Sequence, residues 1–181
     1  MPLITVALVL ANLLVYALEL AFGGQSFCEI YGLIPAHFAP AALLSSLFLH
    51  DPGSLSHIAG NMAFLAVFGA IVEGALGGPL LLAVYLTAGA FGGLMHVLVD
   101  PSSIDPLVGA SGAIFGVLAV AGALRPRLLG FVVAFVGLNI WNAFTGGAST
   151  VSFGCHLGGF FAGFFVVLVL RVSGSEALEA A

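Results

Sequence analysis

Six long apolar runs, separated by short polar or turn-forming stretches, dominate the pattern of hydrophobic and polar positions along the chain. They cover about residues 3–22, 57–73, 79–98, 111–124, 128–145 and 151–171. Apolar runs approaching 20 residues are typical of helices that cross the hydrocarbon core of a bilayer, which is about 30 Å thick. The pattern therefore predicts an all-α polytopic membrane protein, a single domain over residues 1–181 with six transmembrane helices.

The breaks between the runs have the chemistry of turns and loops. The motif "GGP" at 77–79 and the motif "RPR" at 125–127 predict tight turns, whereas "DPSSIDP" at 100–106 and "TGGAST" at 145–150 predict longer loops. The longest connection, about 23–56, contains three prolines and a moderately apolar middle. We expect part of it to lie along the membrane surface.

Composition supports the membrane assignment and excludes one class of partner. The chain is 61% hydrophobic, a larger fraction than a soluble domain of 181 residues uses, and only 6% of its residues are charged. Without a basic patch, nucleic acid is not an expected partner. The two cysteines are too few for a disulfide framework. The first run has no basic segment before it and is long enough to span, so we interpret it as a retained helix rather than a signal peptide.

The three basic residues predict the orientation. If the N-terminus is cytoplasmic, Arg125, Arg127 and Arg171 all lie on the cytoplasmic side, as the positive-inside rule requires. The C-terminus is then cytoplasmic as well. We expect a multi-pass protein of the cell (inner) membrane whose polar site opens to the exterior side.

This orientation brings four polar residues to one depth. Arg125, Arg171 and Glu73 serve as the inner ends of the fourth, sixth and second runs. At about 1.5 Å per residue, Ser111 lies about 21 Å above the inner boundary, His156 about 22 Å, His57 about 24 Å and Asn61 about 18 Å. The 14 residues of the fourth run reach only about 21 Å, so the loop before Ser111 must dip into the membrane. Such a loop is tolerated where protein surrounds it or where it lines a wet cavity.

The motif "GASGAIFG" at 109–116 raises the possibility of a nucleophile. A serine hydroxyl needs a base to take its proton, and His156 lies at the right depth to be that base for Ser111. No acid occurs in the fourth to sixth runs, so the residues predict a Ser–His dyad whose imidazole is held by packing. Phe115, one turn after Ser111, is positioned to stack on His156.

Small residues favour a close approach of the helices that carry the dyad. Gly112 and Gly116 on the fourth run, and Gly159 and Gly163 on the sixth, have the small-xxx-small spacing that lets membrane helices come together. Gly159 and Gly163 share a helix face with His156. We therefore expect these glycines to set the distance between the two helices.

Oxyanion donors are also available. His57 and Asn61, in "HIAGN", are four residues apart and share one helix face. The backbone N–H of Ser111, at the start of a helix, lacks a partner within the helix. Together these groups form a candidate oxyanion hole.

Taken singly, the same residues have plainer interpretations. A membrane serine such as Ser111 more often packs helices, and Asn61 alone indicates interhelical hydrogen bonding. Asn139 and Asn142 are interpreted as such polar contacts, with Trp141 as an interfacial aromatic residue. We interpret Glu73 as structural, capping a turn at the inner face.

The combination resembles the rhomboid family of intramembrane serine proteases. The resemblance rests on "HIAGN", "GASGAIFG" and "CHLGGFFAGF" in that order and covers about residues 30–171. It implies a compact six-helix bundle in which Ser111 is the nucleophile, His156 the general base, and His57 and Asn61 oxyanion donors. It also implies that Phe115 packs on His156 and that Glu73 is structural. Residues 23–56 contain neither the Trp nor the Arg of the pair that many members carry in this loop.

The resemblance implies a serine endopeptidase that cleaves other membrane proteins in or near their transmembrane segments. Its expected partners are transmembrane substrates within the lipid bilayer, and it needs no metal or cofactor. The absence of HExxH argues against a zinc protease. Two alternatives stay open: an inactive rhomboid-like protein that binds transmembrane helices, and a small transporter with a polar site. The oligomeric state is not predicted.

Overall fold

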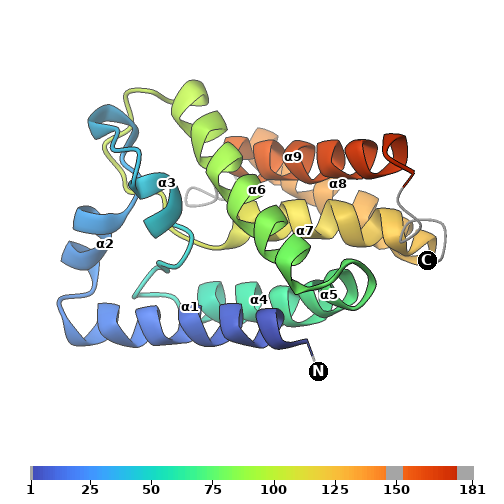
Figure 1. The fold of residues 1–181 in the computed structure, drawn as a ribbon. Helices are drawn as coiled ribbons and strands as arrows, with labels where there is room; N and C mark the ends of the chain where they lie inside the picture. Colours follow the sequence, from blue (N-terminus) through green and yellow to red (C-terminus); the bar gives the residue numbers. More distant parts are fainter. Residues whose placement is uncertain (1, 146–152, 175–181) are drawn as a thin grey trace.

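The computed structural model describes residues 2–145 and 153–174, which form helices joined by short connections (Figure 1). An isolated antiparallel β-bridge joins Leu33 to Leu107. In chain order the elements are α1 (Leu3–Ala21), α2 (Gln25–Tyr31), the 3₁₀ turn η1 (Pro35–His37), α3 (Ala42–Ser45), α4 (Leu55–Phe64), the π-helical turn η2 (Leu65–Gly69), α5 (Ala70–Leu76), α6 (Gly78–Val99), α7 (Ser111–Leu124), the 3₁₀ turn η3 (Pro126–Leu128), α8 (Leu129–Thr145) and α9 (Phe153–Val172).

The helices are those of a multi-pass membrane protein. Four segments of the described chain are long and apolar enough to cross a bilayer: Leu3–Ala21, Leu55–Leu76, Gly78–Val99 and Phe153–Val172. Two shorter apolar segments, Ser111–Leu124 and Pro126–Asn142, accompany them. Many large apolar side chains are exposed, as expected of a surface that faces lipid.

The helix bounds differ from the predicted runs by a few residues. The second run is longer at both ends, because α4, η2 and α5 together form one segment, Leu55–Leu76. The fourth run begins and ends where predicted, at Ser111 and Leu124. The sixth begins at Phe153, and the first two residues predicted for it lie outside the described part of the chain.

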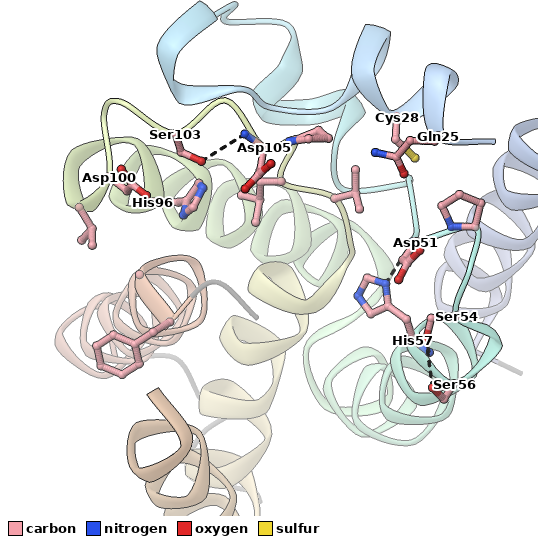
Figure 2. Close-up of a pocket in the computed structure, with 17 residues that line it drawn as sticks. Gln25, Cys28, Asp51, Ser54, Ser56, His57, His96, Asp100, Ser103 and Asp105 are labelled. Carbon is pink, nitrogen blue, oxygen red and sulfur yellow. Dashed lines mark hydrogen bonds between the residues drawn. The ribbon is translucent and has the colours of Figure 1, made fainter. Parts of the chain in front are cut away.

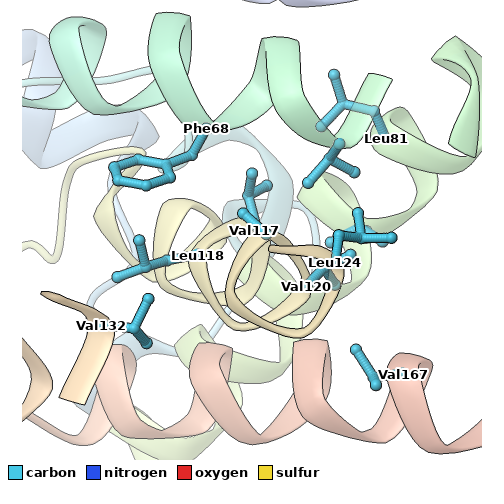
Figure 3. Packing of buried hydrophobic residues seen from close by; sticks show 11 residues of the cluster. Phe68, Leu81, Val117, Leu118, Val120, Leu124, Val132 and Val167 are labelled. Carbon is cyan, nitrogen blue, oxygen red and sulfur yellow. The ribbon is translucent and has the colours of Figure 1, made fainter. Parts of the chain in front are cut away.

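The short helix α7 lies at the centre of the bundle. Of its 14 residues, 12 are buried, which is typical of a helix that is apolar on every side. Figure 3 shows α7 nearly end-on between the α4–α5 segment and α9, with its apolar side chains packed against Phe68, Leu81, Val132 and Val167. Because protein surrounds α7, its length need not match the thickness of a bilayer.

The connection between α1 and α4 gathers at one end of the bundle. It contains α2, η1 and α3, which lie at the end where α1 finishes and α7 begins (Figure 1). The bridge between Leu33 and Leu107 and the bond from the Gly109 N–H to the Ser46 carbonyl (3.0 Å) attach this connection to the loop before α7. The connection thus holds the approach to Ser111 in place.

The side chain of Glu73 caps the first turn of α1. Its carboxylate accepts hydrogen bonds from the backbone N–H groups of Ile4 (2.9 Å) and Thr5 (2.7 Å) and from the Thr5 hydroxyl (2.7 Å). The first N–H groups of a helix have no partner within the helix, and an acid there also complements the helix dipole. The carboxylate therefore links the end of the α4–α5 segment to the start of α1.

A π-helical turn interrupts the segment between α4 and α5. Residues Leu65–Gly69 form this turn, in which Leu65, Phe68 and Gly69 are buried. A β-carbon on Gly69 would lie 3.0 Å from the γ-methyl group of Thr5, so the turn packs closely on α1. Such turns hold one extra residue and often occur near functional sites.

Candidate active site

Ser111 is the first residue of α7, and its hydroxyl contacts the imidazole of His156. The distance from Ser111 Oγ to His156 Nε2 is 2.9 Å, within the range for proton transfer. Gly109, two residues earlier, has φ +125°, a backbone conformation that side-chain-bearing residues rarely adopt. This conformation, with the bond to the Ser46 carbonyl, turns the loop directly into the helix that begins at Ser111.

His156 lies on α9 and is buried, with 7% of its surface exposed. Its ring stacks on Phe115, with centroids 4.3 Å apart and planes within 8° of parallel. Phe115 is one turn after Ser111 on α7, so one face of a single helix provides both the hydroxyl and the stacking surface.

Glycines bring α9 against α7. A β-carbon on Gly159 would overlap the backbone carbonyl oxygen of Gly112, and one on Gly163 would overlap that of Gly116. Backbone atoms cannot move aside as a flexible side chain can, so both positions require glycine for this helix distance. The contact holds His156 within reach of Ser111.

The second ring nitrogen of His156 has a side-chain partner that the sequence interpretation missed. His156 Nδ1 lies 3.2 Å from Oδ1 of Asn139, a residue of α8. The expectation that packing alone holds the imidazole was therefore incomplete. The sequence does contain a signal for this contact. Asn139 lies 12 residues after Arg127, which places it about 18 Å above the inner boundary, at the depth of the other polar residues.

His57 approaches the same place from α4. Its Nδ1 accepts a hydrogen bond from the backbone N–H of Asp51 (3.2 Å), so the neutral ring carries its proton on Nε2. A β-carbon built on Gly109 would lie 3.0 Å from His57 Nε2 and 3.7 Å from Ser111 Oγ. The His57 N–H and the Ser111 hydroxyl therefore face one small space beside Gly109.

Asn61 lies one turn further along α4, with 8% of its surface exposed. Its Nδ2 donates to the backbone carbonyl of His57 (3.0 Å). Among the described residues, no hydrogen bond joins Asn61 to Ser111 or His156. The structure thus places His57 next to Ser111, whereas Asn61 is hydrogen-bonded within its own helix.

A pocket of about 820 Å³ opens beside His57 (Figure 2). It extends from Asp51 and His57 to His96 and Asp100, and Phe153 of α9 also lines it. Among the described residues that line it, none is Lys or Arg, whereas three are Asp: Asp51, Asp100 and Asp105. The pocket therefore presents a polar, acidic entrance next to the candidate oxyanion donor.

Two buried groups near the pocket stay uncharged at neutral pH. Burial, followed by the effect of the neighbouring His57, lowers the pKa of His50 to about 4, and its ring centroid lies 5.2 Å from that of His57. Burial likewise raises the pKa of the Cys28 thiol to about 11, with Glu19 as the next cause. Cys28 is therefore held as a thiol, which is a weak nucleophile compared with a thiolate.

Comparison with known proteins places this arrangement in a family. The model of the rhomboid domain matches residues 37–173, which include all of α4–α9. RHOMBOID-like protein 5 of Arabidopsis thaliana is 33% identical over 141 residues, covering 71% of this chain and 44% of that protein. Rhomboid protease GluP of Bacillus subtilis (strain 168) is 32% identical over 136 residues, covering 71% of this chain and 25% of that protein.

The chain thus spans less than half the length of these curated relatives. The domain model nevertheless matches well over half of this chain, and the match contains the Ser111–His156 pair, the stacking Phe115 and the His57 loop. This chain belongs to the rhomboid family.

Proposed function

We propose that the protein is an intramembrane serine endopeptidase that hydrolyses peptide bonds in or near transmembrane segments of other proteins. The observation that carries the proposal is the 2.9 Å contact between Ser111 Oγ and His156 Nε2, at the start of a buried helix and beside a polar pocket. Its relative GluP is a rhomboid protease, which agrees with the proposal. An inactive helix-binding protein would have no need of an aligned nucleophile and base.

The chemistry follows from this pair. Ser111 Oγ attacks the scissile carbonyl carbon while His156 Nε2 takes the hydroxyl proton, and the carbonyl electrons move onto its oxygen. As the C–O double bond re-forms, the C–N bond breaks and the imidazolium gives its proton to the leaving amine. Water then attacks the acyl-serine in the same way and releases the carboxylate product and free Ser111.

The candidate oxyanion donors are the Nε2–H of His57 and the backbone N–H of Ser111. Asn61, whose amide donates to the His57 carbonyl, is a third candidate one turn further along α4. Donors fixed before the reaction stabilise the developing negative charge without reorganisation. Because the Asp51 N–H occupies Nδ1 of His57, the remaining ring proton is directed toward the space beside Gly109.

The arrangement in the membrane belongs to the same proposal. Six helices span the cell (inner) membrane, both termini are cytoplasmic, and the pocket opens to the exterior side. An intact helix hides its scissile carbonyl within its hydrogen-bond ladder. Substrate segments that unwind easily near the exterior boundary are therefore the ones that reach Ser111.

The test is a cleavage assay in proteoliposomes with purified protein and a model transmembrane segment that carries a helix-breaking residue near its exterior end. We expect a single main cut close to that residue, located by mass spectrometry of both products. Binding of the segment without any cleavage contradicts the proposal and favours the inactive helix-binding alternative. Transport of a solute without cleavage would favour the transporter instead.

Removing the oxyanion donors should lower turnover without unfolding the protein. Loss of one preorganised donor typically costs about 10²–10³ in kcat. We expect His57→Ala to lose about this much, and Asn61→Ala to lose less, because Asn61 bonds to its own helix. The measurement is kcat of each variant at equal melting temperature. Wild-type kcat in both variants would remove α4 from the proposed site.

A further inference from the structure

His156 is held by a contact on each of its two ring nitrogens and on one ring face. Nε2 faces Ser111 Oγ at 2.9 Å, Nδ1 faces Asn139 Oδ1 at 3.2 Å, and Phe115 stacks on the ring. These partners come from α7 and α8, whereas His156 itself is on α9. Within the part of the chain that the structure describes, the Asn139 contact is therefore the hydrogen bond that links α8 to the proposed catalytic pair.

The orientation of the Asn139 amide is fixed by a second hydrogen bond. Its Nδ2 donates to the backbone carbonyl of Phe135 (2.9 Å), one turn earlier on α8. A carbonyl can only accept, so the amide nitrogen must face Phe135 and the amide oxygen must face His156. Phe135 itself packs on Phe115, with ring centroids 5.4 Å apart. The amide is thus positioned by the same aromatic cluster that stacks on the imidazole.

The amide oxygen determines which nitrogen of His156 carries the proton. Because Asn139 Oδ1 can only accept, Nδ1 must be the N–H of the neutral imidazole. Nε2 then has its lone pair directed at the Ser111 hydroxyl, as a general base requires. We propose that Asn139 is a positioning residue that fixes the tautomer and ring orientation of His156; this role rests on the proposed function.

Stacking alone cannot supply this function. A 180° flip of the imidazole about the Cβ–Cγ bond leaves the ring in the same plane, so Phe115 tolerates both orientations. Rotation about this bond has no sharp staggered preference. The Asn139 hydrogen bond distinguishes the two orientations, because only one directs an N–H at Oδ1. A neutral amide also avoids the cost of an ionised acid at this depth in a membrane.

The alternative is that Asn139 only joins helices, as membrane asparagines often do. The variant Asn139→Leu separates the two roles, because leucine has a similar size and suits a membrane helix but accepts no hydrogen bond. The matched control is Asn142→Leu, since Asn142 is exposed three residues further along α8. A helix-joining role predicts a lower melting temperature with normal turnover per folded molecule.

The first measurement is ¹⁵N NMR of histidine-labelled protein, with the His156 signal assigned by its loss in His156→Ala. We expect the Nδ1–H tautomer in the wild type and in Asn142→Leu, and a mixture with Nε2–H in Asn139→Leu. A wild-type spectrum dominated by Nε2–H overturns the proposal. This readout needs no substrate, so it separates failure of the Asn139 role from failure of the protease assignment.

The second measurement is steady-state cleavage with the rate of fluorophosphonate labelling at Ser111. Misplacement of a catalytic group by about 1 Å can cost on the order of 10²-fold. We expect Asn139→Leu to lose about 10- to 10²-fold in kcat and in labelling rate, with KM unchanged, and Asn142→Leu to match the wild type. Unchanged kcat and labelling rate in a folded Asn139→Leu protein would overturn the positioning role.

Discussion

Ser111→Ala is expected to lose cleavage by at least about 10⁴-fold and to lose all labelling by a serine-directed fluorophosphonate. The substitution removes the oxygen that His156 Nε2 contacts at 2.9 Å and leaves no hydroxyl to form an acyl intermediate. Alanine is a good helix former and is smaller than serine, so α7 should fold as before. Labelling by gel fluorescence and cleavage by mass spectrometry measure the two losses separately.

The matched control for this variant is Ser56→Ala. Ser56 is an exposed serine that lines the pocket beside His57 (Figure 2), so its loss changes the entrance without touching the dyad. We expect it to be labelled and to cleave at close to the wild-type rate. Persistent labelling of Ser111→Ala, or loss of labelling in Ser56→Ala, would show that the nucleophile lies elsewhere.

Gly159→Val is the second large effect that we expect. Even a β-carbon at this position would overlap the Gly112 carbonyl oxygen, and valine adds two methyl groups to it. Overpacking of this kind typically destabilises a protein by about 1–3 kcal/mol. The overlap is relieved only if α9 moves away from α7. Because His156 moves with α9, turnover should fall by roughly 10²-fold or more.

A control for Gly159→Val is available on α8. Gly137 has no atom within 4 Å of an added β-carbon among the described residues, so Gly137→Val should fold and cleave normally. Turnover and thermal unfolding of both variants are measured at matched expression. If Gly159→Val keeps near-normal turnover, the α9 glycines do not set the distance between Ser111 and His156.

Much of the fold follows from periodicity and composition. The apolar runs coincide with the helices to within a few residues, because a membrane helix must be apolar over its whole length. The α7 bounds are the clearest case, since Gly109 lies two residues before Ser111 and Arg125 and Pro126 follow Leu124 directly. The resemblance to rhomboids is confirmed by the domain match over residues 37–173.

Contacts between helices are harder to predict, because sequence spacing fixes faces within a helix but not the rotation of one helix against another. The Asn139–His156 contact joins residues 17 apart on different helices, and depth alone allows many partners for Asn139. The same holds for Glu73, whose carboxylate reaches α1, 68 residues away at Thr5. The roles of Ser111 and His156 stay a prediction until the variants are measured.

The π turn at Leu65–Gly69 sets the orientation of the two ends of the second segment relative to each other. Each residue advances an α-helix by about 100°, whereas a residue of a wider π turn advances it by less, so the turn holds one extra residue over nearly the same total rotation. His57 before the turn and Glu73 after it therefore face Asp51 and Thr5 at the same time. If the same residues were wound as a regular α-helix, the part after the turn would rotate by roughly 100° against the part before it, and only one of these two contacts could be kept. Substitutions that force the turn into α-helical winding should therefore separate the Glu73 cap from the His57 site.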